Sequence, residues 1–485
     1  MKVDVAIVGA GPTGLALACE LRLAGVTCQV LERRTDEPNI TRAFAVHART
    51  LELLDGRGLA DRLVPRGQRI QQVQPAPGVA FDLARVDSRY PMVLLVPQSG
   101  TERLLEERAR ELGAEIVRGA EVVGLAQDAD GVRLDIKDQT GAPRTLRASY
   151  AVGTDGAHSA VRRLLGVKFV GRQYETHIIL ADVTLDRPPA DTLFGTGNRE
   201  GLVLLVPFGD GTHRAIVWDK RRDAVPLDEP ITLSELHDAF RRIAGDTFGM
   251  GEPRWRSRFL SERRQAERYR VGRVFLAGDA AHVHSPIGGQ GMNTGIQDAM
   301  NLGWKLASAV HDRGPADLLD TYNQERHPVG ARVLRITDGL NQLVLSSMWL
   351  GRAARTLAIR TAVAIPPLRR RLAGFLTGIG IRYASPAGAH PRVGQRVPNA
   401  GEDGRRVYEA IRTGQFVLVD RRPGAAADSA DGAVVTVRLS PGGAEPALTL
   451  VRPDGYVAWA SDRDDADGLR SALEYWCGPI PLTRP

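Results

Sequence analysis

Residues 3–32 read VDVAIVGAGPTGLALACELRLAGVTCQVLE. The run Val3–Val8 is rich in β-forming residues and predicts a buried strand. Gly9–Gly14 follows with the spacing GxGxxG, and the next residues predict a helix that ends at Gly25. A second apolar run predicts a strand that finishes at Glu32. The stretch therefore predicts a strand–helix–strand unit with a glycine-rich turn, which indicates an α/β fold.

This unit has every part of a dinucleotide-binding fingerprint. The glycines at positions 9, 11 and 14 allow a tight turn and let the backbone approach a pyrophosphate. The helix N-terminus offers unpaired N–H groups and the positive end of the helix dipole. Glu32 would accept hydrogen bonds from ribose hydroxyls, and its charge disfavours a 2′-phosphate. The motif alone does not distinguish NAD(P) from FAD.

Two later segments point to a long ligand. The first is Val152–Ser159, which contains Asp155-Gly156. The second begins at Gly278-Asp279 after a short apolar run and continues through Pro286 to a glycine-rich loop at Gly288–Gly291. Apolar residues then recur at helical spacing. A second glycine-rich loop before a second helix suits a ligand with a phosphate end and another polar, electron-rich end.

These motifs, in this order and spacing, resemble those of the class A flavoprotein monooxygenases, the aromatic hydroxylases with the p-hydroxybenzoate hydroxylase fold. Residues Tyr322–Pro328 also match that family's pattern Tyr-x-x-Glu-Arg-x-Pro. The resemblance covers the whole chain. It is strongest to bacterial hydroxylases that tailor angucyclines and tetracyclines and to rifampicin monooxygenases. These share Arg42, His47–Glu52, and Pro97-Gln98 ahead of Thr101-Glu102.

The resemblance implies a bound FAD. Thr13 would face the pyrophosphate, Glu32 the adenosine ribose, and Gln98 and Asp279 the ribityl or phosphate portion. Pro286 would lie beside the reactive edge of the flavin ring, near the N-terminus of the second helix, whose dipole stabilises the anionic reduced flavin. The expected cofactor contacts are Gly9, Gly11, Thr13, Gly14, Glu32, Arg33, Arg42, Gln98, Val122, Asp155, Asp279, Pro286, Gly289, Gly291, Met292 and Asn293.

Some of these residues have simpler interpretations. Asp155 is a residue favoured in turns before glycine, and Asp279 could be a helix N-cap. His282 and His284 have the spacing of a metal pair on a strand, but no third ligand is nearby, so we expect no metal. The chain has no GxSxG motif, which leaves a serine hydrolase without support.

The family places its substrate against a sheet that corresponds to residues 172–265. Several short β-rich runs in this part of the chain predict that sheet. Nothing in it suggests a cluster of Arg or Tyr for a small benzoate, which fits a large, mostly apolar substrate. The weak candidates for substrate contacts, for which core packing is the alternative, are Val46, Val203, Leu205, Pro207, Arg214 and Pro286.

We therefore expect an α/β fold with an FAD-binding Rossmann-like domain, an interleaved β-sheet substrate domain and a C-terminal thioredoxin-like domain. The last is implied by the turn Arg452–Gly455, and its sole cysteine, Cys477, predicts that it is redox-inactive. The expected boundaries are 1–72, 98–171 and 266–335 for the FAD-binding domain, 73–97 and 172–265 for the substrate domain, 336–388 for a helical segment and 389–485 for the thioredoxin-like domain.

Composition excludes several classes of protein. Hydrophobic residues make up 43% and charged residues 25%, which is typical of a globular protein. The net charge of +7 is spread along the chain and aromatic residues are only 5%, so we expect no nucleic-acid partner. Three cysteines without metal spacing favour a reducing, cytoplasmic location. No apolar run is long enough for a membrane span, and we expect a monomer or homodimer.

The resemblance implies an FAD-dependent aromatic hydroxylase that consumes NADPH or NADH and O2. In that family a flavin C4a-hydroperoxide transfers its distal oxygen to a phenolic ring, so no protein nucleophile is required and the catalytic residues stay unknown. Baeyer–Villiger oxygenation and inactivation of a rifamycin-type compound remain open on the same fold. So do a flavin reductase or dehydrogenase without oxygen insertion and a flavin-bound scaffold without turnover.

Overall fold

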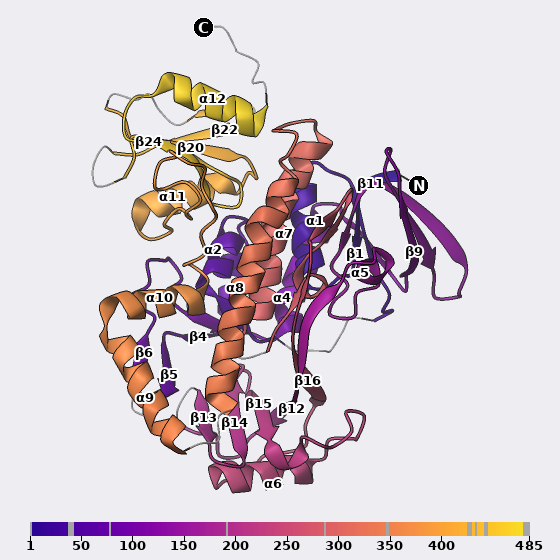
Figure 1. Cartoon of the computed structure of the whole chain (residues 1–485), viewed down its shortest axis with the longest axis vertical. Helices are drawn as coiled ribbons and strands as arrows, with labels where there is room; N and C mark the ends of the chain where they lie inside the picture. The colour runs from indigo at the N-terminus through magenta and orange to yellow at the C-terminus, as the bar shows by residue number, and fades with distance from the viewer. Residues whose placement is uncertain are drawn as a thin grey trace.

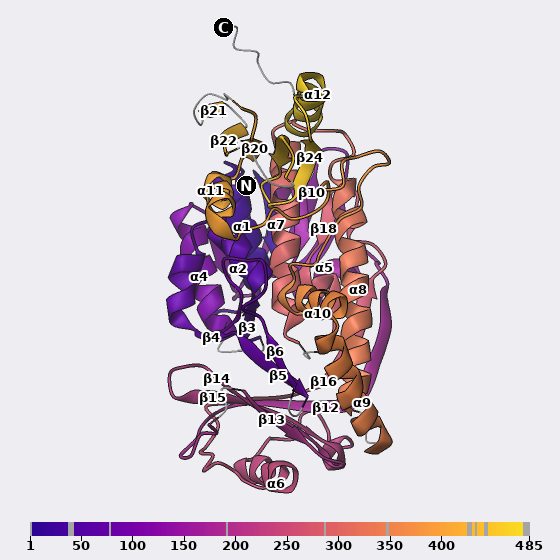
Figure 2. The ribbon, with the colours of Figure 1, turned by 90° about the vertical axis from the view of Figure 1, so that its left-hand side faces the viewer.

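The computed structural model describes residues 2–36, 43–76, 79–190, 193–285, 288–345, 349–423, 429–431, 434–440 and 445–478. The chain is elongated (Figure 1). A six-stranded sheet lies at one end, a five-stranded sheet lies at the other, and an eight-stranded sheet with long helices lies between them (Figures 1 and 2). Two short sheets complete the described strands.

The eight-stranded sheet contains the predicted strand–helix–strand unit. Its path is β17-β18-β11-β1-β2-β8, and β1 pairs in parallel with both β2 and β11. The glycine-rich turn therefore lies at the carboxyl edge of the central strands, where ligands bind in open α/β sheets. The strands are β1 (Lys2–Val8), β2 (Cys28–Glu32), β8 (Glu115–Arg118), β9 (Glu121–Gln127), β10 (Val132–Lys137), β11 (Pro143–Gly153), β17 (Arg270–Val271) and β18 (Val274–Leu276).

Helices α1 (Pro12–Leu23) and α7 (Gln290–Val310) pack closely beside this sheet (Figure 1). Glycine on α7 permits the approach, since a Cβ at Gly303 would overlap Glu20 of α1. The two predicted glycine-rich helix starts are thereby fixed side by side. The remaining helices around this sheet are α2 (Ala48–Asp55), α3 (Ala60–Leu63), η1 (Val64–Arg66), α4 (Gln98–Glu111), α5 (Ala160–Leu164) and η3 (Gly278–Ala280).

The six-stranded sheet is antiparallel in the order β13-β14-β15-β12-β16-β19. Helix α6 (Leu233–Ala244) covers one face, where Val203 and Leu205 are buried. Because side chains alternate along a strand, Leu204 and Val206 face the opposite side. The strands are β12 (Phe169–Thr184), β13 (Phe194–Gly197), β14 (Gly201–Pro207), β15 (Thr212–Asp219), β16 (Trp255–Ala266) and β19 (His282–Val283), and η2 (Lys220–Arg222) follows β15.

Two small sheets lie between the larger ones (Figure 2). An apolar cluster joins the β3-β7-β4 sheet to the residues of β14 and β15 that face away from α6. This cluster, called the inter-sheet cluster below, is therefore shared by the two parts of the molecule. The strands are β3 (Ala45–His47), β4 (Gln68–Ile70) and β7 (Val93–Leu95) in one sheet, and β5 (Gln72–Ala76) and β6 (Val79–Asp82) in the other.

Three helices follow α7. Helix α8 (Asp320–Leu345) runs through position 335, where the sequence predicted a boundary. Helices α9 (Trp349–Ala364) and α10 (Pro366–Thr377) come next, and α9 lies against the β5–β6 hairpin (Figure 1). No helix of the described residues is long and apolar enough to span a membrane.

The five-stranded sheet near the C-terminus has the order β21-β22-β20-β23-β24. One apolar cluster lies between it and α11 (Gly401–Ile411), and another between it and α12 (Ala466–Cys477). The second cluster also contains Trp304 of α7, which attaches this sheet to the centre of the molecule. The strands are β20 (Phe416–Asp420), β21 (Ser429–Asp431), β22 (Val434–Arg438), β23 (Leu448–Val451) and β24 (Val457–Ser461).

Candidate functional site

The three glycines of the first turn have different roles. Gly9 has φ +109°, and a Cβ there would lie 2.5 Å from the carbonyl oxygen of Thr154. A Cβ at Gly14 would overlap the carbonyl oxygen of Gly9, so this glycine permits close strand–helix packing. At Gly11 a Cβ would meet nothing within 4 Å. Only this glycine opens outward, as a position that approaches a ligand must.

Thr13 connects the first motif to the third. A Cβ at Gly278 would lie 2.6 Å from the Thr13 hydroxyl oxygen, and one at Gly295 of α7 would overlap it. The Thr13 side chain therefore fits a notch that two glycines create. The turn before α1, the Gly278 segment and the first turns of α7 form one surface, which we call the cradle.

Glu32 at the end of β2 is buried and ionised. Its carboxylate accepts hydrogen bonds from the N–H of Ala10 (2.9 Å) and from the backbone N–H and Nε of Arg34 (3.0 and 2.9 Å). Burial alone would raise its pKa, but these hydrogen bonds lower it. An acceptor carboxylate at this position fits ribose hydroxyls. The sequence pointed to Arg33, whose side chain is exposed, whereas Arg34 pairs with the acid.

The Asp155-Gly156 motif organises helix α5. The Asp155 carboxylate accepts hydrogen bonds from the Ser159 hydroxyl and from the N–H groups of Ala160 and Val161 (2.5–3.1 Å). Asp155 therefore helps to cap the start of α5, a role that differs from the turn residue offered by the sequence as the alternative to a cofactor contact. Arg162, which sequence reasoning missed, donates to the carbonyl of Ala280 (2.8 Å). It thereby ties this motif to the Gly278 segment.

Asp279 has an exposed carboxylate in the middle of the cradle. Within the described residues it makes no side-chain hydrogen bond, unlike an N-cap. One of its oxygens lies 3.9 Å from the position a Cβ would take at Gly291, at the start of α7. The open carboxylate and the unpaired N–H groups of the helix start offer acceptors and donors on one side of the cradle.

The start of α7 is locked to β3. Asn293 accepts from the N–H of His47 (2.9 Å) and donates to the carbonyls of Ala45 and Gly289 (both 2.8 Å). Gly289 has φ +61° and is the residue before the helix. Burial lowers the pKa of His47 to about 4, so its ring is neutral beside this loop. Both N–H groups of the Asn293 amide are thereby used within the fold.

A buried network that sequence reasoning missed supports the cradle. Asp298 of α7 binds His282 Nε2 (2.7 Å), Arg326 Nε (2.7 Å) and the N–H of Gly278 (3.1 Å). Burial would raise the pKa of Asp298, but Arg326 and His282 lower it. His282 therefore serves the fold, and the described residues hold no group of three potential metal ligands. Buried charges in proteins are paired, and this rule was the signal that could have led from the sequence to the network.

The other expected cofactor contacts lie on several elements, and of these only the start of α7 belongs to the cradle. Gln98 begins α4, Val122 is a buried residue of β9, and Met292 lies in the first turn of α7. Arg42 and Pro286 lie outside the described residues.

The expected substrate residues divide between two faces. Val46 belongs to the central core, and Val203 and Leu205 pack under α6, which favours the core-packing alternative for all three. Arg214 is buried and pairs with Asp182 (2.5 Å), and Pro207 ends β14. The inter-sheet cluster was not predicted: its buried members are Ala45, Ile70, Leu95 and Val206, with Phe44, Val73, Val93, Leu193, Leu204 and Ile216 partly buried.

The inter-sheet cluster adjoins the cradle. A Cβ at Gly289 would lie 3.0 Å from the Cβ of Ala45, a member of the cluster. Six of its side chains keep some exposed apolar surface. An apolar surface therefore begins where the glycine-rich loop before α7 ends.

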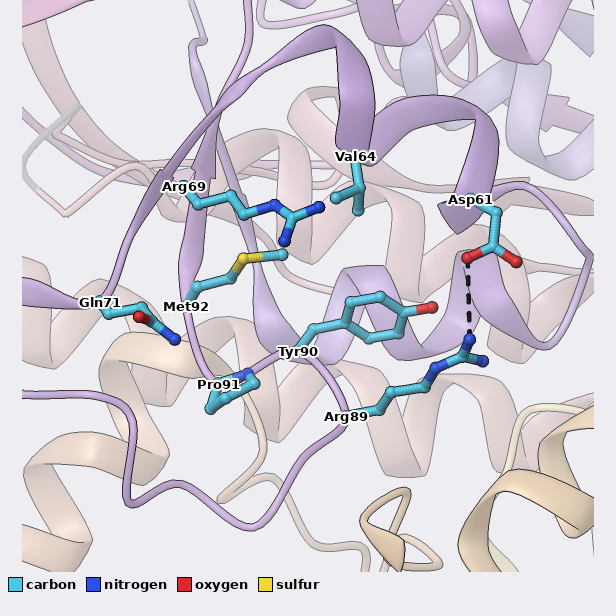
Figure 3. A pocket seen from close by; sticks show the side chains of 8 residues that line it. All are labelled: Asp61, Val64, Arg69, Gln71, Arg89, Tyr90, Pro91 and Met92. Carbon is cyan, nitrogen blue, oxygen red and sulfur yellow. Dashed lines mark ion pairs between the residues drawn. The ribbon is translucent and has the colours of Figure 1, made fainter. Parts of the chain in front are cut away.

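A separate pocket of about 290 Å³ lies near Tyr90 (Figure 3). In it Arg89 pairs with Asp61 (3.8 Å), and Arg69 approaches from β4. Its lining residues are Asp61, Val64, Arg69, Gln71, Arg89, Tyr90, Pro91 and Met92. None of them belongs to the cradle or to the inter-sheet cluster, so we assign this pocket no part in the chemistry.

The cradle fits FAD. The opening at Gly11 and the helix start behind it suit the pyrophosphate, and the ionised Glu32 suits ribose. The uncompensated Asp279 suits ribityl hydroxyls, which can donate to it. The N-terminus of α7 offers positive potential, which would suit the negative charge of a reduced flavin.

Comparisons with known proteins agree. Residues 2–337 match the model of the FAD binding domain family, and residues 390–479 match the aromatic-ring hydroxylase C-terminal family. The chain is 41% identical to a rifampicin monooxygenase of Streptomyces venezuelae, over 98% of each chain. It is 40% identical to a 12-dehydrotetracycline 5-monooxygenase/anhydrotetracycline 6-monooxygenase of Streptomyces rimosus, over 99% of each.

A solved structure extends the likeness to three dimensions. The anhydrotetracycline hydroxylase OxyS of Streptomyces rimosus superimposes with a TM-score of 0.87 at 39% identity, covering 99% of this chain and 100% of that one. The sequence-based assignment of the family and of FAD is confirmed. The chain belongs to the FAD-dependent aromatic-ring hydroxylases, flavoprotein monooxygenases with the p-hydroxybenzoate hydroxylase fold.

Proposed function

We propose that this enzyme hydroxylates a polycyclic, polyketide-derived phenol. The observation that carries the proposal is the inter-sheet cluster, which supplies apolar surface from both sheets beside the glycine-rich loop before α7. A flat, apolar ring system gains about 25 cal/mol for each Å² it buries there. The relatives whose names specify tetracycline intermediates support the same substrate class.

Bound FAD, reduced by NAD(P)H, supplies the activation of O2 for oxygen transfer. The protein contributes binding and orientation. Gly11 and the start of α1 hold the pyrophosphate, Asp279 the ribityl chain, and the N-terminus of α7 the anionic end of the ring. The inter-sheet cluster excludes water and orients the substrate ring. None of these roles requires a protein nucleophile.

Mass analysis of products formed under ¹⁸O₂ tests the proposal. Polycyclic phenols should raise NAD(P)H oxidation several-fold and yield a product carrying one ¹⁸O in a new hydroxyl. A lactone from a ketone would indicate Baeyer–Villiger oxygenation, and NAD(P)H oxidation without a labelled product would indicate a reductase. Either result would overturn hydroxylation.

Neighbouring residues of β14 give a matched pair of variants. Leu204→Ala, in the inter-sheet cluster, should raise KM several-fold with a small loss of stability. Leu205→Ala, under α6, should cost about 2–5 kcal/mol of stability and leave KM unchanged. The reverse result would place the substrate on the α6 side.

We also propose a cytoplasmic enzyme that is a monomer or homodimer. Three buried cysteines without a disulfide support a reducing location.

A further inference from the structure

Gln98 is held at the start of α4 by several hydrogen bonds. Its backbone N–H donates to the carbonyl of Ala43 (3.0 Å), and its side-chain Oε1 accepts from the N–H of Ala43 (2.9 Å). Its Nε2 donates to Oε1 of Glu102, one helical turn later (2.7 Å). A backbone N–H can only donate, so the amide oxygen must face Ala43 and the orientation of the amide is determined.

This orientation determines what Gln98 can offer a ligand. Of the two N–H groups on Nε2, one is used by Glu102 and the other has no partner within the described residues. The half-buried amide therefore presents a donor. Phosphate oxygens only accept hydrogen bonds and ribityl oxygens can do so, whereas a reversed amide would present a carbonyl oxygen, which repels phosphate.

Glu102 is an unusual residue to bury at this place. Glu102 is only 7% exposed, and its carboxyl accepts a hydrogen bond from Gln98. The charged groups that face it are Arg34, Glu32 and Arg118. Both arginines are paired elsewhere, Arg34 with Glu32 (2.9 Å) and Arg118 with Glu106 (2.6 Å).

Without a cation of its own, this carboxyl is held partly neutral. Burial raises the pKa of Glu102 to about 7, although Gln98 and Arg34 act in the opposite direction. Both the neutral and the ionised carboxyl can accept from Nε2, so the hydrogen bond persists across neutral pH. Near an anionic ligand the neutral form is favoured.

We propose that Glu102 is a positioning residue for FAD, which holds the Gln98 amide so that its free N–H faces the cofactor. The inference rests on the proposed contact between Gln98 and FAD. It predicts that a residue without direct contact with FAD controls FAD affinity through one hydrogen bond. It also predicts that, near neutral pH, FAD binding is accompanied by protonation of the Glu102 carboxylate.

Titration of the apoprotein with FAD, followed by quenching of flavin fluorescence, tests this with variants of the full chain. At pH 6, Glu102→Leu should weaken FAD binding about tenfold, or ~1.4 kcal/mol. Glu102→Gln should restore affinity to within about twofold, because its carbonyl accepts the same bond. The matched control is Glu107→Leu on the same helix, whose carboxylate pairs with Arg62 and should not affect Kd.

The pH profile separates positioning from a merely structural role. For the wild type, Kd should rise several-fold between pH 6 and 8 as Glu102 ionises beside the cofactor, and Glu102→Gln should remove this rise. Equal Kd for wild type and Glu102→Leu at pH 6 would overturn the inference. So would Glu102→Gln binding as weakly as Glu102→Leu.

Two further outcomes identify where a failure lies. If the wild type binds FAD but Gln98→Leu binds it equally well, the contact with Gln98 is wrong and the inference falls alone. If the wild type binds no FAD at any pH, the proposed function falls with it.

Discussion

The turn Arg452–Gly455 and the cradle both carry charged groups, but the turn buries and pairs them, whereas the cradle leaves one exposed and without a side-chain hydrogen bond in the described part of the chain. At the turn, Arg452 binds Glu325 of α8 (2.6 and 3.0 Å) and Asp454 (2.5 and 3.0 Å). Lys305 of α7 adds a bond to the same Glu325 (2.8 Å). We call this set the junction, since it joins the five-stranded sheet to α7 and α8.

The cradle leaves comparable groups open. Asp279 has no side-chain hydrogen bond within the described residues, and Gly11 faces empty space. Native proteins pair nearly all their buried polar groups, so the closed network of the junction fits a structural interface. The exposed carboxylate of Asp279 lies among the cofactor motifs and bonds to nothing in the described fold, which fits a ligand site. The comparison assigns stability to the junction and binding to the cradle, and variants can separate the two.

Among these variants, Arg452→Met should cause the largest loss of stability. Removing the arginine leaves Glu325 and Asp454 buried without their main cation, which costs about 3–5 kcal/mol of unfolding free energy. Denaturant unfolding of the apoprotein measures this.

The double variant Arg452→Met with Glu325→Met is its control. Replacing both partners of a buried pair restores most of the loss, because no unpaired charge remains. If Arg452→Met unfolds like the wild type while losing FAD, the junction is part of the binding site and the comparison is wrong.

Asp279→Ala should give the converse result. Loss of a charged acceptor costs about 1.5–3 kcal/mol of binding, so FAD affinity should fall roughly ten- to hundredfold. Stability of the apoprotein should change by less than about 0.5 kcal/mol, because the carboxylate supports nothing in the fold. FAD content after gel filtration measures the loss of binding, and unfolding of the apoprotein measures the change in stability.

An exposed aspartate away from the motifs, Asp130 in the β9–β10 turn, supplies the control as Asp130→Ala. Full FAD content in Asp279→Ala would remove this residue from the site.

Sequence reasoning recovered the elements of the cradle well. The strand–turn–helix of residues 3–24 and the C-terminal strands follow from local pattern, since apolar periodicity and glycine spacing act within a few residues. The motif glycines were found for the same reason. Their division into packing glycines and the open Gly11 required the position of Thr154, which is distant in sequence.

The junction and the substrate face could not be recovered in this way. Glu325 and Arg452 are 127 residues apart, and no local pattern links them. The strand Leu202–Val206 alternates in sequence, but only the position of α6 shows that Leu204 rather than Leu205 faces the inter-sheet cluster. Strand periodicity defines two faces without telling which one is covered.

The two regions should also respond to pH with opposite sign. In the junction, Arg452 and Lys305 outweigh burial and hold the pKa of Glu325 well below its usual range. Its contribution to stability is present above about pH 4.5 and is lost as pH falls. Near the cradle, the pKa of Glu102 is raised to about 7, so its contribution is present at low pH and is lost as pH rises through 7.

The free energy of unfolding of the apoprotein at pH 6 and at pH 8 measures the contribution of Glu102. One carboxyl with these pKa values loses ~1 kcal/mol across that interval, and Glu102→Gln should remove the loss. Glu325→Gln should leave the difference between pH 6 and 8 unchanged while reducing the loss below pH 4.5. A Glu102→Gln protein with the wild-type pH dependence would show that another group titrates there.

The smallest effect should come from Cys477, the cysteine beside the junction. It is buried at the end of α12 in the cluster that contains Trp304, and burial raises the pKa of its thiol to about 12. A thiol held protonated neither attacks a disulfide nor forms one readily. Cys477→Ala removes little apolar surface, so we expect a loss of stability of at most about 1 kcal/mol and unchanged turnover, with or without dithiothreitol. Substrate-stimulated NAD(P)H oxidation and thermal unfolding check both. A large fall in turnover at unchanged stability would mean that this part of the chain does more than hold α7 in place.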